Sequence, residues 1–182
     1  MYLIVTRSFP PEVGGMQSLM WGLAKEMSKN FMIKVFADHY ENHKEFDKKV
    51  NFSIERVGGI KFLRKIRKAQ LINEYLKESK VQGIIADHWK SIELIVTDKK
   101  KYCLIHGKEI NHAKGSSLNK RANKVLNSVE KVIANSEYTK NLVPVRDGDS
   151  DLFNAMKQIP ETGKGPENQT PSAGCSIKWK NS

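Results

Sequence analysis

Short hydrophobic runs alternate along the chain with stretches in which hydrophobic residues recur every three or four positions. The first run, residues 2–6, is continuous and apolar, which is typical of a strand buried on both faces of a sheet. Similar runs or alternations predict further strands at 32–37, 52–57, 82–87, 101–105 and 131–134.

The more widely spaced hydrophobic positions predict helices between these strands. The clearest set occupies one face of a helix that follows the first strand: Met16, Leu19, Met20, Leu23, Ala24 and Met27. Related patterns predict helices at 61–80, 89–97, 118–129 and 137–143. Strands that alternate with helices predict an α/β fold, with a parallel sheet and helices on both faces.

Polar residues follow the ends of several predicted strands. They include the Gly14-Gly15 pair, Asp87-His88, His106-Gly107 and Asn135-Ser136, where Ser136 is a candidate helix cap. Because ligands bind beyond the carboxyl ends of parallel strands, we expect these residues to converge on one edge of the sheet.

The connection after the first strand reads Pro-Pro-Glu-Val-Gly-Gly over residues 10–15. Prolines end the strand, and glycines allow a tight turn or a close backbone approach to a ligand. The N–H groups at the start of the next helix suit an anion. The segment lacks the third glycine of the dinucleotide fingerprint. By itself it fits an anion-binding loop and a simple strand–turn–helix connection equally well.

Composition and charge indicate a globular domain with an anionic partner. The 182 residues are 39% hydrophobic and 28% charged, and no run is long enough for a membrane span. The first run is too short for a signal peptide, so a cytoplasmic location is expected. The net charge is +11, and the five basic and five acidic residues after Val143 cancel, so the excess belongs to residues 1–143.

Other candidate features are weaker. Cys103 lies in an apolar run and is expected to be a buried thiol. His39 and His43 have helical spacing for a metal, but a solvated loop at 38–51 is the preferred interpretation because no third ligand is near.

The predicted helix at 61–80 combines a basic start with an apolar stripe, Phe62, Ile66, Ala69, Ile72 and Leu76. The basic residues are Lys61, Arg64, Lys65, Arg67 and Lys68. Such a helix can bind an anionic membrane surface. The preferred alternative is a core-facing helix with a solvated basic back.

Three separated segments resemble the N-terminal domain of family 4 glycosyltransferases, which are two-domain GT-B enzymes. They are the Pro-Pro-x-x-Gly-Gly loop at 10–15, His106-Gly107-Lys108-Glu109, and the strand-to-serine segment at 130–140. The resemblance spans roughly residues 2–143 and implies a Rossmann-like domain over 1–143. Residues 144–182 resemble no part of the family's second domain. We expect them to form an irregular, poorly ordered tail. The chain is then either truncated or one part of a natural split protein, and we expect it to be inactive by itself.

The resemblance also implies roles for particular residues. His106 would be catalytic, contacting the transferred sugar, although without the family pattern it would only cap a strand. Gly14 and Gly15 would lie against the donor phosphates or the acceptor. Glu109 would bind acceptor hydroxyls or orient a loop. His88 and Ser136 are further donor or acceptor contacts, with Ser136 first a helix cap.

The implied reaction is retaining transfer from a nucleotide sugar to a glycan or lipid-linked acceptor, in cell-surface polysaccharide or glycolipid synthesis. No metal or other cofactor is expected, since GT-B enzymes commonly work without one. A lipid-linked acceptor would place the enzyme peripherally at the inner membrane surface. The alternatives are a non-catalytic sugar-nucleotide or partner-binding module and a GT-B-fold epimerase. A nucleic-acid partner is not expected, because charge is its only indication.

Overall fold

The computed structural model describes residues 1–142, so the predicted tail at 144–182 and the predicted domain end at 143 lie outside the described part. Six strands form one parallel sheet with the order β3-β2-β1-β4-β5-β6. The strands are β1 (Tyr2–Val5), β2 (Ile33–Asp38), β3 (Ser53–Val57), β4 (Gly83–Ala86), β5 (Lys100–Ile105) and β6 (Lys131–Ala134). The helices are α1 (Gly15–Met27), α2 (His43–Asp47), α3 (Lys61–Glu78), α4 (Trp89–Ile92), α5 (Ser117–Asn127) and α6 (Glu137–Lys140).

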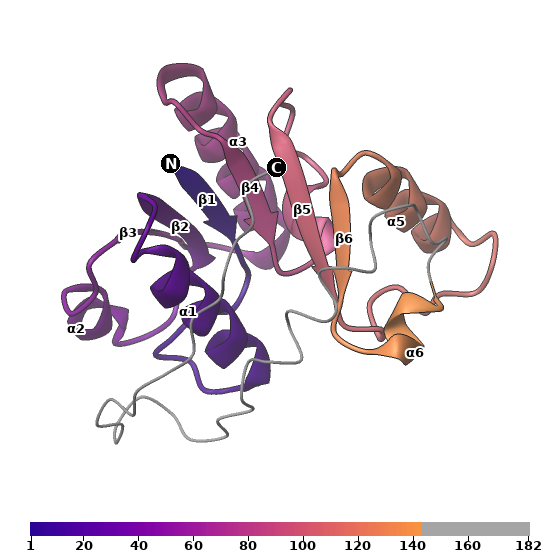
Figure 1. Ribbon diagram of the computed structural model, residues 1–182, viewed down its shortest axis with the longest axis horizontal. Helices are drawn as coiled ribbons and strands as arrows, with labels where there is room; N and C mark the ends of the chain where they lie inside the picture. The colour runs from indigo at the N-terminus through magenta and orange to yellow at the C-terminus, as the bar shows by residue number, and fades with distance from the viewer. Residues whose placement is uncertain (143–182) are drawn as a thin grey trace.

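The first strand lies in the middle of the sheet. Ile4 of β1 is in register with Val35 of β2 on one side and with Ile85 of β4 on the other. Figure 1 shows α2 beyond β3 at one side of the molecule and α5 and α6 beside β6 at the other. The predicted α/β class, with a Rossmann-like parallel sheet, is confirmed.

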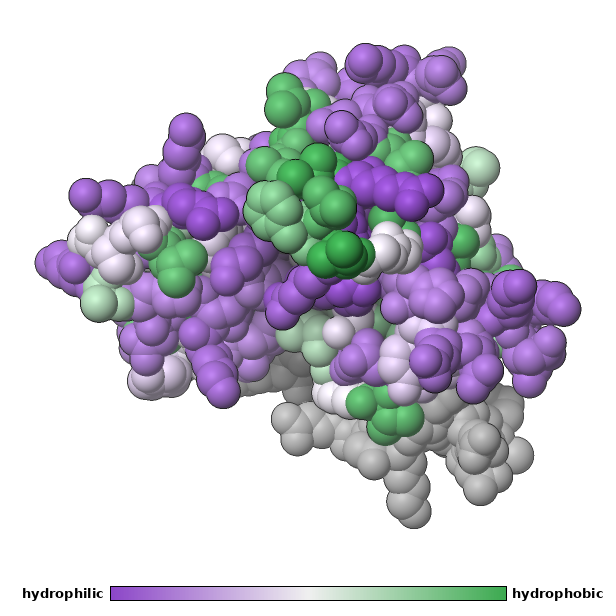
Figure 2. Space-filling model, turned by 180° about the vertical axis from the view of Figure 1, so that it is seen from behind, coloured by the Kyte–Doolittle hydropathy of each residue, from purple (hydrophilic) through white to green (hydrophobic). Residues whose placement is uncertain are grey.

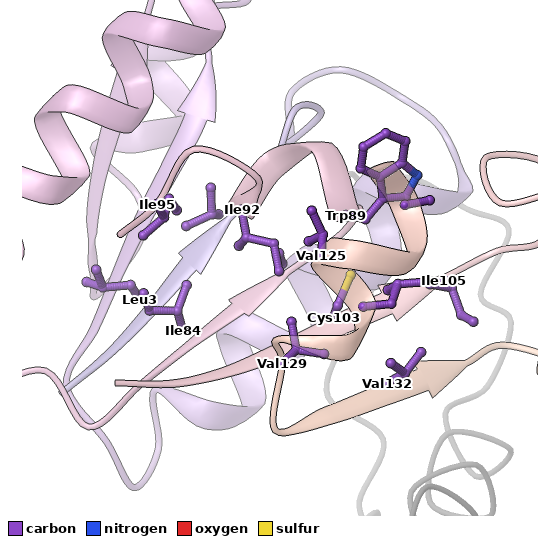
Figure 3. Packing of buried hydrophobic residues seen from close by; sticks show 14 of the residues in the cluster. Leu3, Ile84, Trp89, Ile92, Ile95, Cys103, Ile105, Val125, Val129 and Val132 are labelled. Carbon is purple, nitrogen blue, oxygen red and sulfur yellow. The ribbon is translucent and has the colours of Figure 1, made fainter. Parts of the chain in front are cut away.

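Alternate strand residues point to two hydrophobic clusters, one on each face of the sheet. Leu3 and Val5 face the cluster formed with α3, α4 and α5, whereas Ile4 faces the cluster formed with α1. Figure 3 shows the first cluster, with Trp89 at the opposite end from Leu3 and with Cys103 buried inside it. Helices therefore cover both faces, and this explains why the central strands β1 and β4 are hydrophobic without interruption.

Two predicted elements differ in the structure. The predicted helix at 89–97 ends at Ile92, because Asn73 of α3 binds the Leu94 carbonyl and the Val96 N–H, which a longer helix would need. The predicted loop at 38–51 contains the short helix α2. Within residues 1–142, no group of three His, Cys, Asp or Glu side chains lies together as a metal site.

The apolar stripe predicted for α3 begins later than expected. Ala69 and Ile72 are buried, but Phe62 is 72% exposed and Leu63 is 58% exposed. Figure 2, which views the molecule from behind, shows mostly hydrophilic side chains around one main hydrophobic patch. Among the described residues, no helix has the length and apolar character needed to cross a membrane.

Candidate functional site

The carboxyl ends of the strands are tied together by a buried carboxylate, that of Asp87 after β4. Its Oδ2 accepts hydrogen bonds from the Thr6 hydroxyl at 2.8 Å and from the Arg7 N–H at 2.9 Å. Its Oδ1 accepts one from the Ser91 hydroxyl at 2.7 Å. The loops after β1 and β4 are thus fixed beside each other, as convergence at one edge requires.

Lys68 of α3 forms a second buried contact at this edge. Its Nζ donates to the Thr6 carbonyl at 2.7 Å and to Asp38 Oδ1 at 2.6 Å. Burial lowers the Lys68 pKa, while the Asp38 carboxylate opposes that shift. The prediction that Lys68 lies on a membrane-facing surface is therefore wrong, because its charge is needed inside the protein to hold Asp38.

The remaining basic residues of α3 divide into paired and exposed ones. Arg64 Nε lies 3.1 Å from the Asp38 carboxylate, and Lys65 donates to the Glu93 carboxylate. Lys61 and Arg67 are exposed. The structure thus leaves two of the five predicted membrane-surface cations exposed and without an ion pair to the described residues.

His106 follows β5 and is partly buried. Its backbone N–H donates to the Glu109 carboxylate, and its ring Nε2 is shielded from solvent and has no partner among the described residues. Burial lowers the His106 pKa, opposed by the carboxylates of Glu109 and Asp87 and by a hydrogen bond to the Asp87 backbone. A neutral imidazole with one unused nitrogen is the result, and an unsatisfied buried polar atom costs about 1–3 kcal/mol.

Glu109 fixes the loop that carries His106. Its carboxylate holds the His106 N–H, and its carbonyl accepts a hydrogen bond from the Trp89 indole at 3.0 Å. Gly107, between His106 and Glu109 in the sequence, has a φ of 95°, and a Cβ there would lie 3.0 Å from the Thr139 hydroxyl. Of the two roles predicted for Glu109, these contacts support orientation of the loop.

Ser136 caps the short helix α6, as predicted. Its hydroxyl oxygen accepts a hydrogen bond from the Thr139 N–H at 3.1 Å, and Asn135 Oδ1 accepts one from the Thr139 hydroxyl at 2.9 Å. Because Thr139 also lies against Gly107, the loops after β5 and β6 are in contact.

The two glycines precede and begin α1. The Gly14 carbonyl accepts the Ser18 N–H at 3.0 Å, and a Cβ on Gly14 would lie only 2.3 Å from Gln17 Oε1. Gly15 is exposed, with no atom within 4 Å of the position of a Cβ. The start of α1 is therefore open on the Gly15 side.

Arg56 of β3 holds this loop, although in the sequence it stands out only as an outward position in an alternating strand. Its side chain is 4% exposed and donates to the Pro10 carbonyl. It also binds Asp47 of α2 through two nitrogens, at 2.7 and 3.2 Å, and lies over the Phe9 ring. The loop geometry thus depends on a contact between segments far apart in sequence.

His88 is the N-cap of α4. Its Nδ1 accepts the Lys90 N–H at 2.9 Å, so the ring proton lies on Nε2. Burial, together with the positive charges of Arg7 and Lys90, lowers the His88 pKa to about 3. His88 is therefore a neutral donor at this edge.

The fold and this edge define a Rossmann-like α/β domain of the type that forms one half of a GT-B glycosyltransferase. Among solved structures, the apo form of the lipopolysaccharide outer core galactosyltransferase WaaB is similar over 78% of this chain, with a TM-score of 0.53 and 13% identity. The match covers 41% of that enzyme's chain, so this chain spans less than half of its length. At this identity the likeness shows the fold alone. No family model and no curated protein matches the sequence.

Proposed function

We propose that residues 1–142 form the acceptor-side lobe of a retaining, nucleotide-sugar-dependent glycosyltransferase of family 4, active in polysaccharide or glycolipid synthesis. One observation carries the proposal. The segments with family resemblance follow β1, β5 and β6, three strands whose carboxyl ends lie at one edge of a parallel sheet. A GT-B lobe uses this edge to form its half of the cleft.

His106 would hydrogen-bond a hydroxyl group of the transferred sugar. Its unpartnered Nε2 supports this role, since a hydroxyl group that donates to it would satisfy a buried polar atom. Glu109 would act as a positioning residue, because its carboxylate holds the backbone N–H of His106. Ser136 would add a contact from the neighbouring loop.

The glycine loop would stabilise the leaving diphosphate. The first N–H groups of α1 have no partners within the helix and carry the positive end of its dipole. Charge that develops on the departing nucleotide is stabilised by such preorganised donors. The open space beside Gly15 leaves room for a phosphate to approach these groups.

A charge introduced at Gly15 tests this function. We expect UDP-sugars to bind the 182-residue chain weakly and to shift amide NMR signals at 14–17, 106–109 and 136. Gly15→Asp should weaken binding about tenfold, because the added carboxylate repels the diphosphate, while stability is kept since an acid favours a helix start. Gly15→Ala is the matched control, which adds the same Cβ without the charge.

The results separate the proposal from its alternatives. Shifts that are absent, or that appear at the amino edge of the sheet near 31–34, would contradict it. Binding with no transfer to any glycan or lipid acceptor, even with a complementary second lobe, would indicate a non-catalytic module. His106→Ala, compared with the exposed His39→Ala, tests the catalytic role through the rate of sugar transfer in the two-lobed enzyme.

A further inference from the structure

Lys65, Lys90 and Arg121, from three different segments, meet around Trp89 and Glu93 at the carboxyl edge, and Arg7, from a fourth segment, is close enough to Lys90 to lower its pKa. The Glu93 carboxylate binds two of them. It accepts hydrogen bonds from Lys65 Nζ and from Arg121 Nε and Nη2, the latter two at 2.8 and 2.9 Å. This single carboxylate is therefore already saturated by two cations.

A third cation, Lys90, lies beside the Trp89 ring. Lys90 Nζ lies 5.1 Å from a ring centroid of Trp89, and the Arg121 guanidinium carbon lies 5.8 Å from one. Lys90 is partly buried and forms no ion pair with the described residues. Burial and the charges of Arg7, Arg121 and Lys65 lower its pKa.

Arg7 completes the group from the loop after β1. Its backbone N–H is bound by Asp87, which places it next to the start of α4, and its side chain is exposed and unpaired among the described residues. The Asp87 carboxylate offsets part of this charge, but Thr6, Ser91 and the Arg7 N–H occupy its two oxygens, and the Arg7 side chain forms no ion pair with it. His88 is close enough to both Arg7 and Lys90 for their charges to lower its pKa, and its Nε2–H has no partner among the described residues.

These four cations outnumber the two nearby carboxylates, Glu93 and Asp87, which leaves an excess of positive charge at this edge. Like charges held together repel, and the repulsion is stronger where water is excluded. An anion with several oxygens would relieve it. Arginine, lysine and an imidazole N–H are all donors that can bind the oxygens of a phosphate group.

We propose that Arg7, Lys90 and His88 bind a phosphate group carried by the acceptor. The site differs from the start of α1, because α1 packs on one face of the sheet and α4, which precedes Glu93 and carries Lys90, packs on the other, although Arg7 belongs to the loop that leads to α1. The assignment to the acceptor rests on the proposed function, whereas the phosphate site itself does not. A phosphorylated sugar and a phospholipid headgroup share this chemistry.

Phosphate titration of the 182-residue chain tests the site directly. At constant ionic strength, sodium phosphate and glycerophosphate should shift the Lys90 amide and the Trp89 indole N–H signals. The double variant Arg7→Gln/Lys90→Gln should weaken binding at least about tenfold, because two charge-assisted hydrogen bonds are lost. Lys61→Gln/Arg67→Gln is the matched control, as it removes the same charge from exposed positions outside the group.

The outcomes are distinct. Absence of the shifts, or equal loss of binding in the control, overturns the phosphate site. Phosphatidylglycerol vesicles that displace glycerophosphate identify a headgroup as the source, and failure to displace it identifies a soluble phosphorylated acceptor. UDP that shifts the Lys90 signal and displaces phosphate overturns the acceptor assignment. Phosphate binding without any UDP-sugar effect at Gly15 would refute the proposed function and leave the phosphate site standing.

Discussion

His88 caps α4 at a place where a protonated imidazole would be buried beside positive charges. Its pKa of about 3 lies well below the ordinary value of 6.5. Between about pH 3 and pH 6.5, His88 is therefore protonated in the unfolded chain but neutral in the folded chain. The resulting loss of unfolding free energy is absent above about pH 6.5, grows as the pH falls, and reaches its full size below about pH 3.

We expect the protein to lose stability on acidification, by about 2 kcal/mol from this residue between pH 7 and pH 5. His88→Asn should reduce that loss, because asparagine can accept the Lys90 N–H as a helix cap but does not titrate. Urea unfolding at the two pH values measures the effect. An unchanged pH dependence in the variant would show that His88 is not its source.

The ion pair between Arg56 and Asp47 allows a second prediction, on how much a buried ion pair contributes to stability. Asp47→Ala leaves a buried guanidinium without its counter-ion, so it should cost about 3 kcal/mol of unfolding free energy. Glu45→Ala removes the exposed pair with Lys48 on the same helix and should cost less than about 1 kcal/mol. Chemical denaturation compares the two variants. Equal costs would show that the buried pair contributes no more than a surface one.

Sequence patterns identified candidate site residues only where these residues directly follow a predicted strand. His106 and Ser136 follow predicted strands, so their position at the sheet edge could be predicted from topology. The contacts of Arg56 with Pro10, and of Trp89 with Glu109, join segments distant in sequence. No local periodicity encodes such contacts, and they became visible only in the folded chain.

At the scale of elements, strands were predicted to within one or two residues, because each is a continuous or alternating apolar segment. Helices were predicted less well where other elements decide their ends. The α4 helix stops because Asn73 binds the following backbone. In α3, periodicity could not show that Lys68 points inward, because a lysine normally marks a solvated face.

The adjacent residues Lys68 and Arg67 of α3 should respond differently to the same change. Lys68→Met removes the donor held by Thr6 and Asp38 and should cost about 2 kcal/mol. Arg67→Met changes an exposed side chain and should stay within about 0.5 kcal/mol. Thermal unfolding of the two variants gives the comparison, and similar losses would contradict the burial of Lys68.

For the whole molecule, the start of α3 is the remaining candidate for contact with an anionic membrane. Phe62 and Leu63 are exposed beside Lys61, and Arg67 is exposed one turn further on. We expect weak, salt-sensitive binding to anionic vesicles. Each cation contributes about 1 kcal/mol near the surface, and screening limits the attraction to roughly 8 Å at physiological salt.

Vesicle co-sedimentation distinguishes the two contributions. Phe62→Gln/Leu63→Gln should reduce binding at all salt concentrations, whereas Lys61→Gln/Arg67→Gln should remove the salt-sensitive part. Vesicles without anionic lipid are the control. If the parent protein fails to bind anionic vesicles at low salt, the start of α3 has another role.

Because β1 lies in the middle of the sheet, the first strand to be synthesised needs neighbours on both edges. The partner β2 follows soon, but β4 begins only at Gly83. Until then a growing chain would carry an apolar strand with one open edge, which is a template for aggregation. Translation of β4 closes that edge and delivers Asp87 and His88 immediately afterwards. The step that protects the nascent chain therefore also begins assembly of the edge that holds the candidate site residues.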